Sequence, residues 1–180
     1  MKVNFYLPLV FLAIFSCTSQ NDKEYFPFKS FLENELNQID SLPIAVFKYT
    51  NRNNFTDTAI VEKKEFRELT RSLLYLDLQE KNVQSHYNEL VLEDTDIDNI
   101  AISYSTEKNQ FPIKRLQLNI KTGTTLVKSF YVERVDRLNG ITILRRILWN
   151  SKNGVTVTSI YYKDNKAEEL ITEKYSWSLQ

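Results

Sequence analysis

Arg145 and Arg146 are adjacent arginines whose position in an apolar segment suggests a ligand site. They are neighbours in segment 141–149, which has the apolar content of a central β-strand, so their side chains must point to opposite faces of a sheet. One guanidinium then lies on the core side, where a charge requires a partner or an open cavity. The pair therefore predicts a polar pocket, and both arginines are candidate ligand residues.

A second group of candidates is the carboxylate cluster in the segment EDTDID, residues 93–98. Asp94, Asp96 and Asp98 have the spacing of the first three oxygen ligands in a calcium-binding loop. The next two diagnostic positions of such a loop hold Asn99 instead of glycine and Ser105 instead of a bidentate glutamate. We therefore interpret the cluster as an acidic turn before a strand, with calcium binding as the alternative.

Other kinds of catalytic site find little support in the composition. His86 is the only histidine, and its neighbours Ser85 and Tyr87 form no nucleophile or base motif. The three glycines of the chain are too far apart to form a phosphate-binding loop. We expect no catalytic residues, no metal and no cofactor, and hence a protein that is not an enzyme.

The N-terminus has the three parts of a secretory signal peptide. Lys2 supplies a positive charge, residues 5–15 are apolar apart from Tyr6 and Pro8, and small or polar residues follow. This apolar run is shorter than the ~20 residues that a helix needs to cross a bilayer. The segment is therefore left out of the fold.

The end of this segment, Ile14-Phe15-Ser16-Cys17, resembles the lipobox of bacterial lipoproteins. The resemblance implies cleavage before Cys17 and attachment of a diacylglycerol to its thiol. Two or three acyl chains would hold the protein firmly on a membrane, at about 0.8 kcal/mol per buried methylene. The alternatives are an ordinary signal peptide with a chance cysteine and a short uncleaved anchor.

The domain organisation follows from this interpretation. Residues 1–16 would be the signal peptide, 17–24 a lipidated flexible tether without apolar residues after the cysteine, and 25–180 a single globular domain. In the sorting rule for bacterial lipoproteins, an aspartate directly after the cysteine retains the protein in the inner membrane. Thr18 stands there instead, which indicates the outer membrane, on its periplasmic or surface face. A lipidated Cys17 would leave no thiol for disulfides or metal sites.

The charge balance bears on the partners. The whole chain has no net charge, and we expect no nucleic-acid partner. Residues 17–110 hold ten Lys and Arg against seventeen Asp and Glu, whereas residues 111–180 hold twelve against six. Either the two halves compensate each other, or a basic sheet face meets an anionic partner. The even spread of basic residues along the strands favours compensation.

Apolar periodicity predicts the elements that position these candidates. Three- and four-residue spacing predicts helices over residues 28–40 and 63–77, and strands are expected at 44–50 and 58–61. From residue 86 onward the period becomes two, and the last five long strands are separated by Gly-containing or Asp-Asn turns. The fold class is therefore α+β: a long antiparallel meander, curved or bent into a half-barrel, packed against two helices of the N-terminal half.

Two helices and a long antiparallel meander behind a lipobox also resemble, in outline, the Lol lipoprotein-carrier family. That resemblance implies a curved sheet that holds acyl chains. The sequence therefore leads to two expectations. The first is a membrane-anchored envelope lipoprotein with a non-enzymatic binding or assembly role and an envelope protein as partner. The alternative is a carrier of lipid or lipoprotein. An interaction module requires an exposed apolar or basic patch, and a carrier requires a large apolar cavity.

Overall fold

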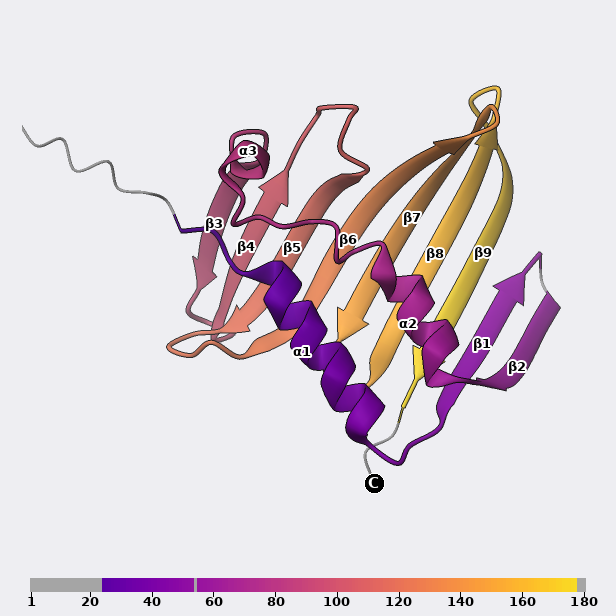
Figure 1. Cartoon of the computed structure of the whole chain (residues 1–180), viewed down its shortest axis with the longest axis horizontal. Helices are drawn as coiled ribbons and strands as arrows, with labels where there is room; N and C mark the ends of the chain where they lie inside the picture. The colour runs from indigo at the N-terminus through magenta and orange to yellow at the C-terminus, as the bar shows by residue number, and fades with distance from the viewer. Residues whose placement is uncertain (1–23, 54, 178–180) are drawn as a thin grey trace, which may run out of the picture.

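The computed structural model describes residues 24–53 and 55–177, in which nine antiparallel strands form one open sheet and three helices lie in the N-terminal half (Figure 1). The helices are α1 (Phe28–Ser41), α2 (Lys63–Arg71) and the short α3 (Lys81–Gln84). The strands are β1 (Val46–Arg52), β2 (Phe55–Val61), β3 (Asn88–Asp94), β4 (Asn99–Ser105), β5 (Ile113–Lys121), β6 (Val127–Leu138), β7 (Ile141–Asn150), β8 (Gly154–Lys163) and β9 (Lys166–Ser176).

The strands lie in the order β2-β1-β9-β8-β7-β6-β5-β4-β3. From β3 to β9 each strand pairs with the next one along the chain, and the hairpin of β1 and β2 then joins the C-terminal strand through pairs such as Lys48 with Tyr175. The sheet does not close, so β2 and β3 are its two edges. The predicted fold class, a long antiparallel meander with helices from the N-terminal half, is confirmed; β5 to β9 are the five predicted long strands.

The hairpin turns show why the strands end where they do. Asn139 and Gly140 both have positive φ angles, of 51° and 79°, as do Asp164 and Asn165, of 49° and 61°. Two successive positive φ values are typical of the tight turn that matches the twist of an antiparallel pair. Gly154 is different, because it begins β8 with a φ of 140° and a methyl group there would overlap the carbonyl oxygen of Tyr175 in β9.

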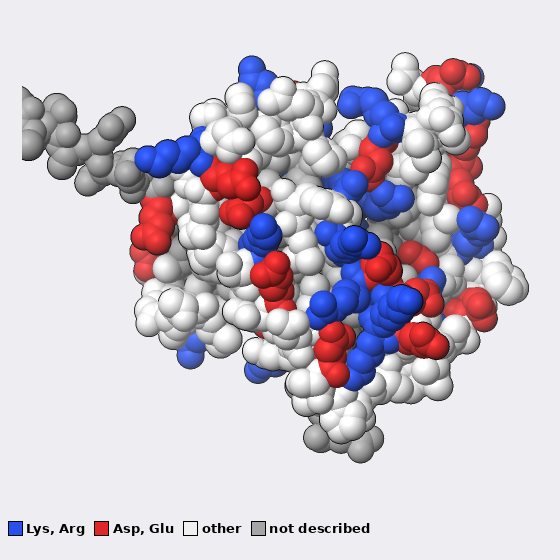
Figure 2. Space-filling model, viewed as in Figure 1, with Lys and Arg blue, Asp and Glu red and all other residues white. Residues whose placement is uncertain are grey.

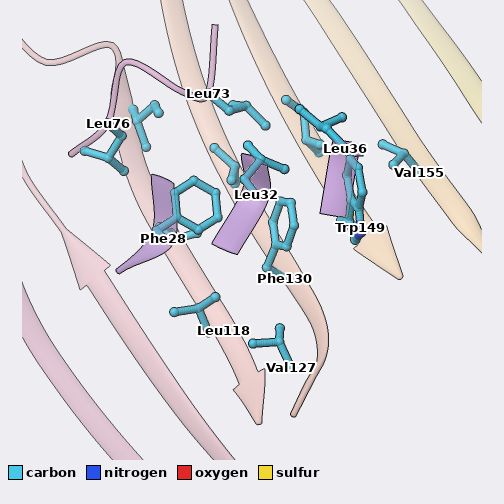
Figure 3. Packing of buried hydrophobic residues seen from close by; sticks show 14 of the residues in the cluster. Phe28, Leu32, Leu36, Leu73, Leu76, Leu118, Val127, Phe130, Trp149 and Val155 are labelled. Carbon is cyan, nitrogen blue, oxygen red and sulfur yellow. The ribbon is translucent and has the colours of Figure 1, made fainter. Parts of the chain in front are cut away.

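The core fills the space between the helices and one face of the sheet (Figure 3). Helix α1 buries residues three or four apart, which places them on one face of the helix: Phe28, Leu32, Leu36 and Ile39. They pack on Phe130 of β6 and Trp149 of β7, whose rings stack with centroids 5.3 Å apart. Phe66 of α2 contacts Trp149 from above, with centroids 5.7 Å apart.

Helix α2 ends earlier than the sequence predicts. The pattern indicated a helix over residues 63–77, but α2 stops at Arg71, and Leu73 and Leu76 are buried in the turns that follow. A continuing helix would bond the Leu76 N–H to the carbonyl of Ser72. Arg134 Nη1 donates to that carbonyl instead, at 3.1 Å, and the Leu76 N–H donates to Leu73. A side chain from the sheet therefore takes the place of the next helical turn.

Candidate functional site

Arg145 and Arg146 lie on opposite faces of β7, as the alternation predicts. Arg145 shares the helix-covered face with the core residue Trp149, whereas Arg146 points to the other face and pairs with Glu133 at 3.6 Å. The side chain of Arg146 is 51% exposed, which makes this pair a surface contact. The structure thus places Arg145, and not Arg146, at the polar site on the core side.

Arg145 shares one carboxylate, that of Asp136, with a second arginine on β6. Arg134 donates to Asp136 through Nε at 2.9 Å and Nη2 at 2.7 Å, and Arg145 Nη1 contacts the same carboxylate. The side chains of Arg134, Asp136 and Arg145 are only 16%, 22% and 33% exposed. Ser159 of β8 is buried next to Arg145 in the register. We call Arg134, Asp136 and Arg145 the arginine–aspartate cluster. In this cluster two positive charges share one negative charge.

An apolar cavity of about 200 Å³ opens beside this cluster. Its walls come from the turns after α2, from the residue before β3 and from the start of β5, with Arg134 at one end: Ser72, Tyr75, Leu76, Tyr87, Phe111, Pro112, Ile113 and Arg134. The Tyr87 hydroxyl donates to the Ile113 carbonyl at 2.7 Å, and burial raises the pKa of Tyr87 above its ordinary value. The cavity can hold one small apolar group, because cavities of ~150 Å³ take up a single benzene ring.

The carboxylate cluster lies at the turn between β3 and β4. The Asp94 carboxylate accepts the N–H of Asp96 at 3.1 Å, and Asp98 adopts a positive φ of 51° while its carbonyl accepts Lys128 Nζ at 2.8 Å. The three carboxylates are exposed. In residues 24–53 and 55–177, no group of three His, Cys, Asp or Glu side chains is placed to hold a metal ion. The geometry is that of an acidic turn.

The edge strand β3 is the feature that sequence reasoning missed. The period of two from residue 86 onward predicted strands here but not which faces are covered, and Leu90, Val91 and Leu92 are 57%, 52% and 58% exposed. The edge is also acidic, since residues 82–107 contain six Asp and Glu and no Lys or Arg. Figure 2 shows an acidic group at the left edge, on the side of β3, below a basic side chain, whereas both signs are mixed over the face that carries α2. That local excess of acidic residues is the sequence feature that could have indicated the β3 edge as a candidate site.

Of the remaining candidates, His86 touches the wall of the apolar cavity through Phe111. His86 packs against Phe111, with ring centroids 5.2 Å apart, and lies just before β3. Cys17, the predicted lipidation site, lies outside the described residues. No helix within the described ranges is long and apolar enough to span a membrane.

Comparison with known proteins adds no relative from which a role could be transferred. No protein-family model matches the chain, and no match was found among curated proteins or solved structures.

Proposed function

We propose that this chain is an envelope lipoprotein, held on a membrane by lipid on Cys17, whose domain binds another protein and catalyses no reaction. The observation that supports the binding role is the edge strand β3, on which Leu90, Val91 and Leu92 are all more than half exposed. Natural proteins usually shorten, bulge or cover such an edge, because its free backbone groups and apolar side chains pair with other chains. An apolar edge that none of the described residues covers is therefore best explained by a partner.

The positions of the titratable side chains support a role without catalysis. His86 lies before the start of β3, and Asp94 to Asp98 lie at its other end. Seven residues of strand separate them by about 20 Å, too far for a base and a carboxylate to act on one substrate group. In the arginine–aspartate cluster, the carboxylate of Asp136 is bonded to two guanidinium groups, which is consistent with a structural role.

Acyl-chain carriage is the second candidate, and the apolar cavity beside Arg134 is the observation in its favour. Its volume of about 200 Å³ is below the ~300–1,000 Å³ of ordinary ligand sites. The space between α1 and the sheet, where a carrier would hold acyl chains, is filled by Phe28, Leu32 and Leu36. The cavity would accept one ring or a short branched chain, so protein binding has the stronger support.

The anchoring part of the proposal is tested by metabolic labelling with radioactive palmitate. The full-length chain should incorporate label and sediment with membranes, and Cys17→Ser should do neither. An unlabelled wild-type chain would refute the lipid anchor, whatever the domain binds.

The binding part is tested by chemical crosslinking in intact cells. The full-length chain should give a discrete protein adduct, and Leu90→Ser/Leu92→Ser should reduce it. The matched control is Ile60→Ser, because Ile60 is 70% exposed on the other edge strand, β2. A wild-type chain that gives no protein adduct, but carries a bound species of acyl mass in native mass spectrometry, would replace protein binding by carriage.

A further inference from the structure

We propose that β3 binds its partner by strand addition, and that the partner contributes an extended segment rich in Lys and Arg. The inference rests on the protein-binding role proposed above and adds the geometry and the charge of the partner. It follows from three properties of the β3 edge: a backbone that pairs with a described strand on one side only, apolar side chains on both faces, and acidic surroundings.

The backbone of β3 is available on one side. In the described sheet β3 pairs with β4 alone, so the N–H and C=O groups that point away from β4 have no strand opposite them. An extended segment that pairs there satisfies these groups without any rearrangement of the sheet. Strand addition therefore continues the antiparallel order that already runs through nine strands.

The side chains of β3 are exposed on both faces. The register places Leu90 beside Ser103 and Leu92 beside Ala101, on the face away from the helices, so that both leucines extend beyond small neighbours. Val91 pairs with Ile102 on the helix side and is also more than half exposed. A segment lying along β3 would cover apolar side chains above and below the sheet, as an added strand with alternating residues does.

The charge of the edge selects a basic partner. Between residues 82 and 107 there are six acidic side chains and no Lys or Arg. Lys128 of β6 reaches the turn after β3, where it donates to the Asp98 carbonyl, but the carboxylates of Glu93, Asp94 and Asp96 remain exposed at the end of β3. Lys or Arg in a neighbouring strand would lie opposite these carboxylates and gain from cross-strand pairing. An anionic lipid surface would instead be repelled by them.

The same charges disfavour a second copy of this chain. Antiparallel pairing of two β3 strands about Val91 would align the leucines, but it would place Glu89 of each copy opposite Glu93 of the other. Like charges directly opposite each other destabilise a strand pair. The acidic residues therefore prevent self-pairing while they favour a basic segment.

Site-specific photocrosslinking of the full-length lipoprotein in intact cells tests this inference. Benzoylphenylalanine replaces Leu90 or Leu92 on β3, and Ile60 on β2 and Leu148 on the helix-free face serve as control positions with 70% and 51% exposure. We expect positions 90 and 92 to crosslink to one partner peptide, at residues two apart, and the peptide to carry net positive charge. Positions 60 and 148 should not crosslink to that peptide.

Charge reversal supplies the second measurement. Glu93→Lys/Asp96→Lys should lower the yield of the adduct about tenfold, since each attraction becomes a repulsion. The matched control Glu33→Lys/Glu168→Lys changes two exposed glutamates on α1 and β9 and should leave the yield within about twofold. Equal thermal midpoints of the variants would show that the fold is intact.

The outcomes separate this inference from the proposed function. Protein crosslinks only from Ile60 or Leu148 would overturn strand addition at β3 and leave the protein-binding role standing. Crosslinks to lipid, to a second copy, or to a peptide without net positive charge would also overturn it. No protein crosslink from any of the four positions would overturn both.

Discussion

Replacing Asp136 by asparagine is expected to destabilise the fold by about 2 kcal/mol, several times the cost of the matched change Glu133→Gln. Asparagine keeps the size of the side chain and one acceptor oxygen but removes the negative charge. Arg134 and Arg145 would then lie side by side on the helix-covered face without their common counter-ion. The change therefore tests whether the arginine–aspartate cluster stabilises the sheet beneath the cavity.

The magnitude follows from the exposure of the three side chains. Removing one partner of a fully buried ion pair costs ~3–5 kcal/mol, and an exposed pair contributes ~0–1 kcal/mol. Arg134, Asp136 and Arg145 are 16%, 22% and 33% exposed, between these limits, which gives a value of about 2 kcal/mol. The Glu133–Arg146 pair is longer, at 3.6 Å, and half exposed, so its loss should cost less than about 0.5 kcal/mol.

Urea unfolding at pH 7 of residues 17–180 carrying Cys17→Ser provides the assay. Asp136→Asn should lower the midpoint by roughly 1 M at an unchanged slope, while Glu133→Gln should hardly move it. In the Asp136→Asn background, Arg145→Met should restore part of the loss, because it removes one of two unmatched charges. Equal costs for the Asp136 and Glu133 variants, or additive costs for Asp136 and Arg145, would refute the reasoning.

Three further substitutions test separate features of the fold. Gly154→Ala should cost more than about 3 kcal/mol of unfolding free energy, because its methyl group would overlap the carbonyl oxygen of Tyr175. Gly123 has a φ of 70° and nothing within 4 Å, so Gly123→Ala should cost only the backbone strain of about 1–2 kcal/mol. Similar shifts in the thermal midpoints of the two variants would contradict this. Thr122→Val should be neutral or stabilising by up to ~1 kcal/mol, since the buried Thr122 hydroxyl has no hydrogen-bond partner in the described structure, and a clear loss in urea unfolding would argue against it. Burial raises the pKa of Tyr87, so the stability that its neutral form contributes is complete below about pH 10 and is lost as the pH rises through the folded-state pKa. Tyr87→Phe should therefore flatten the decline of the unfolding free energy at alkaline pH. Parallel declines of the wild type and the variant would count against the burial argument.

The parts of the fold that were predictable from the sequence are those specified by local residues. Asn139 and Gly140 determine a tight turn because few other residue pairs adopt two positive φ angles. The apolar spacing from Phe28 to Ile39 specifies one buried helix face, and α1 begins at the predicted residue, Phe28. Alternation in β7 likewise determines that Arg145 and Arg146 diverge, whatever lies around them.

Contacts between distant segments were not predictable. The end of α2 depends on Arg134, which lies 62 residues after the Ser72 carbonyl that it binds. The partner of Arg145 depends on the register of the β6–β7 hairpin, which brings Asp136 within reach. Period-two alternation shows that a strand has two faces but not whether any layer covers them, which is why Leu90 and Leu92 were not recognised as exposed.

The start of the domain relates the proposed anchor to the proposed binding edge. The Tyr25 hydroxyl donates to the Tyr87 carbonyl at 3.0 Å, and the Phe26 N–H donates to the Tyr104 hydroxyl at 2.9 Å. The chain therefore enters the domain beside the first residue of β3 and the end of β4. Seven residues of fully extended chain from Cys17 to Glu24 span at most about 25 Å. With the additional span from Glu24 through the Tyr25 side chain to Tyr87, a lipid on Cys17 would keep the start of β3 within a few tens of ångströms of the bilayer. The partner expected at β3 must then present its basic segment close to a membrane surface, which favours a membrane-bound partner over one free in solution.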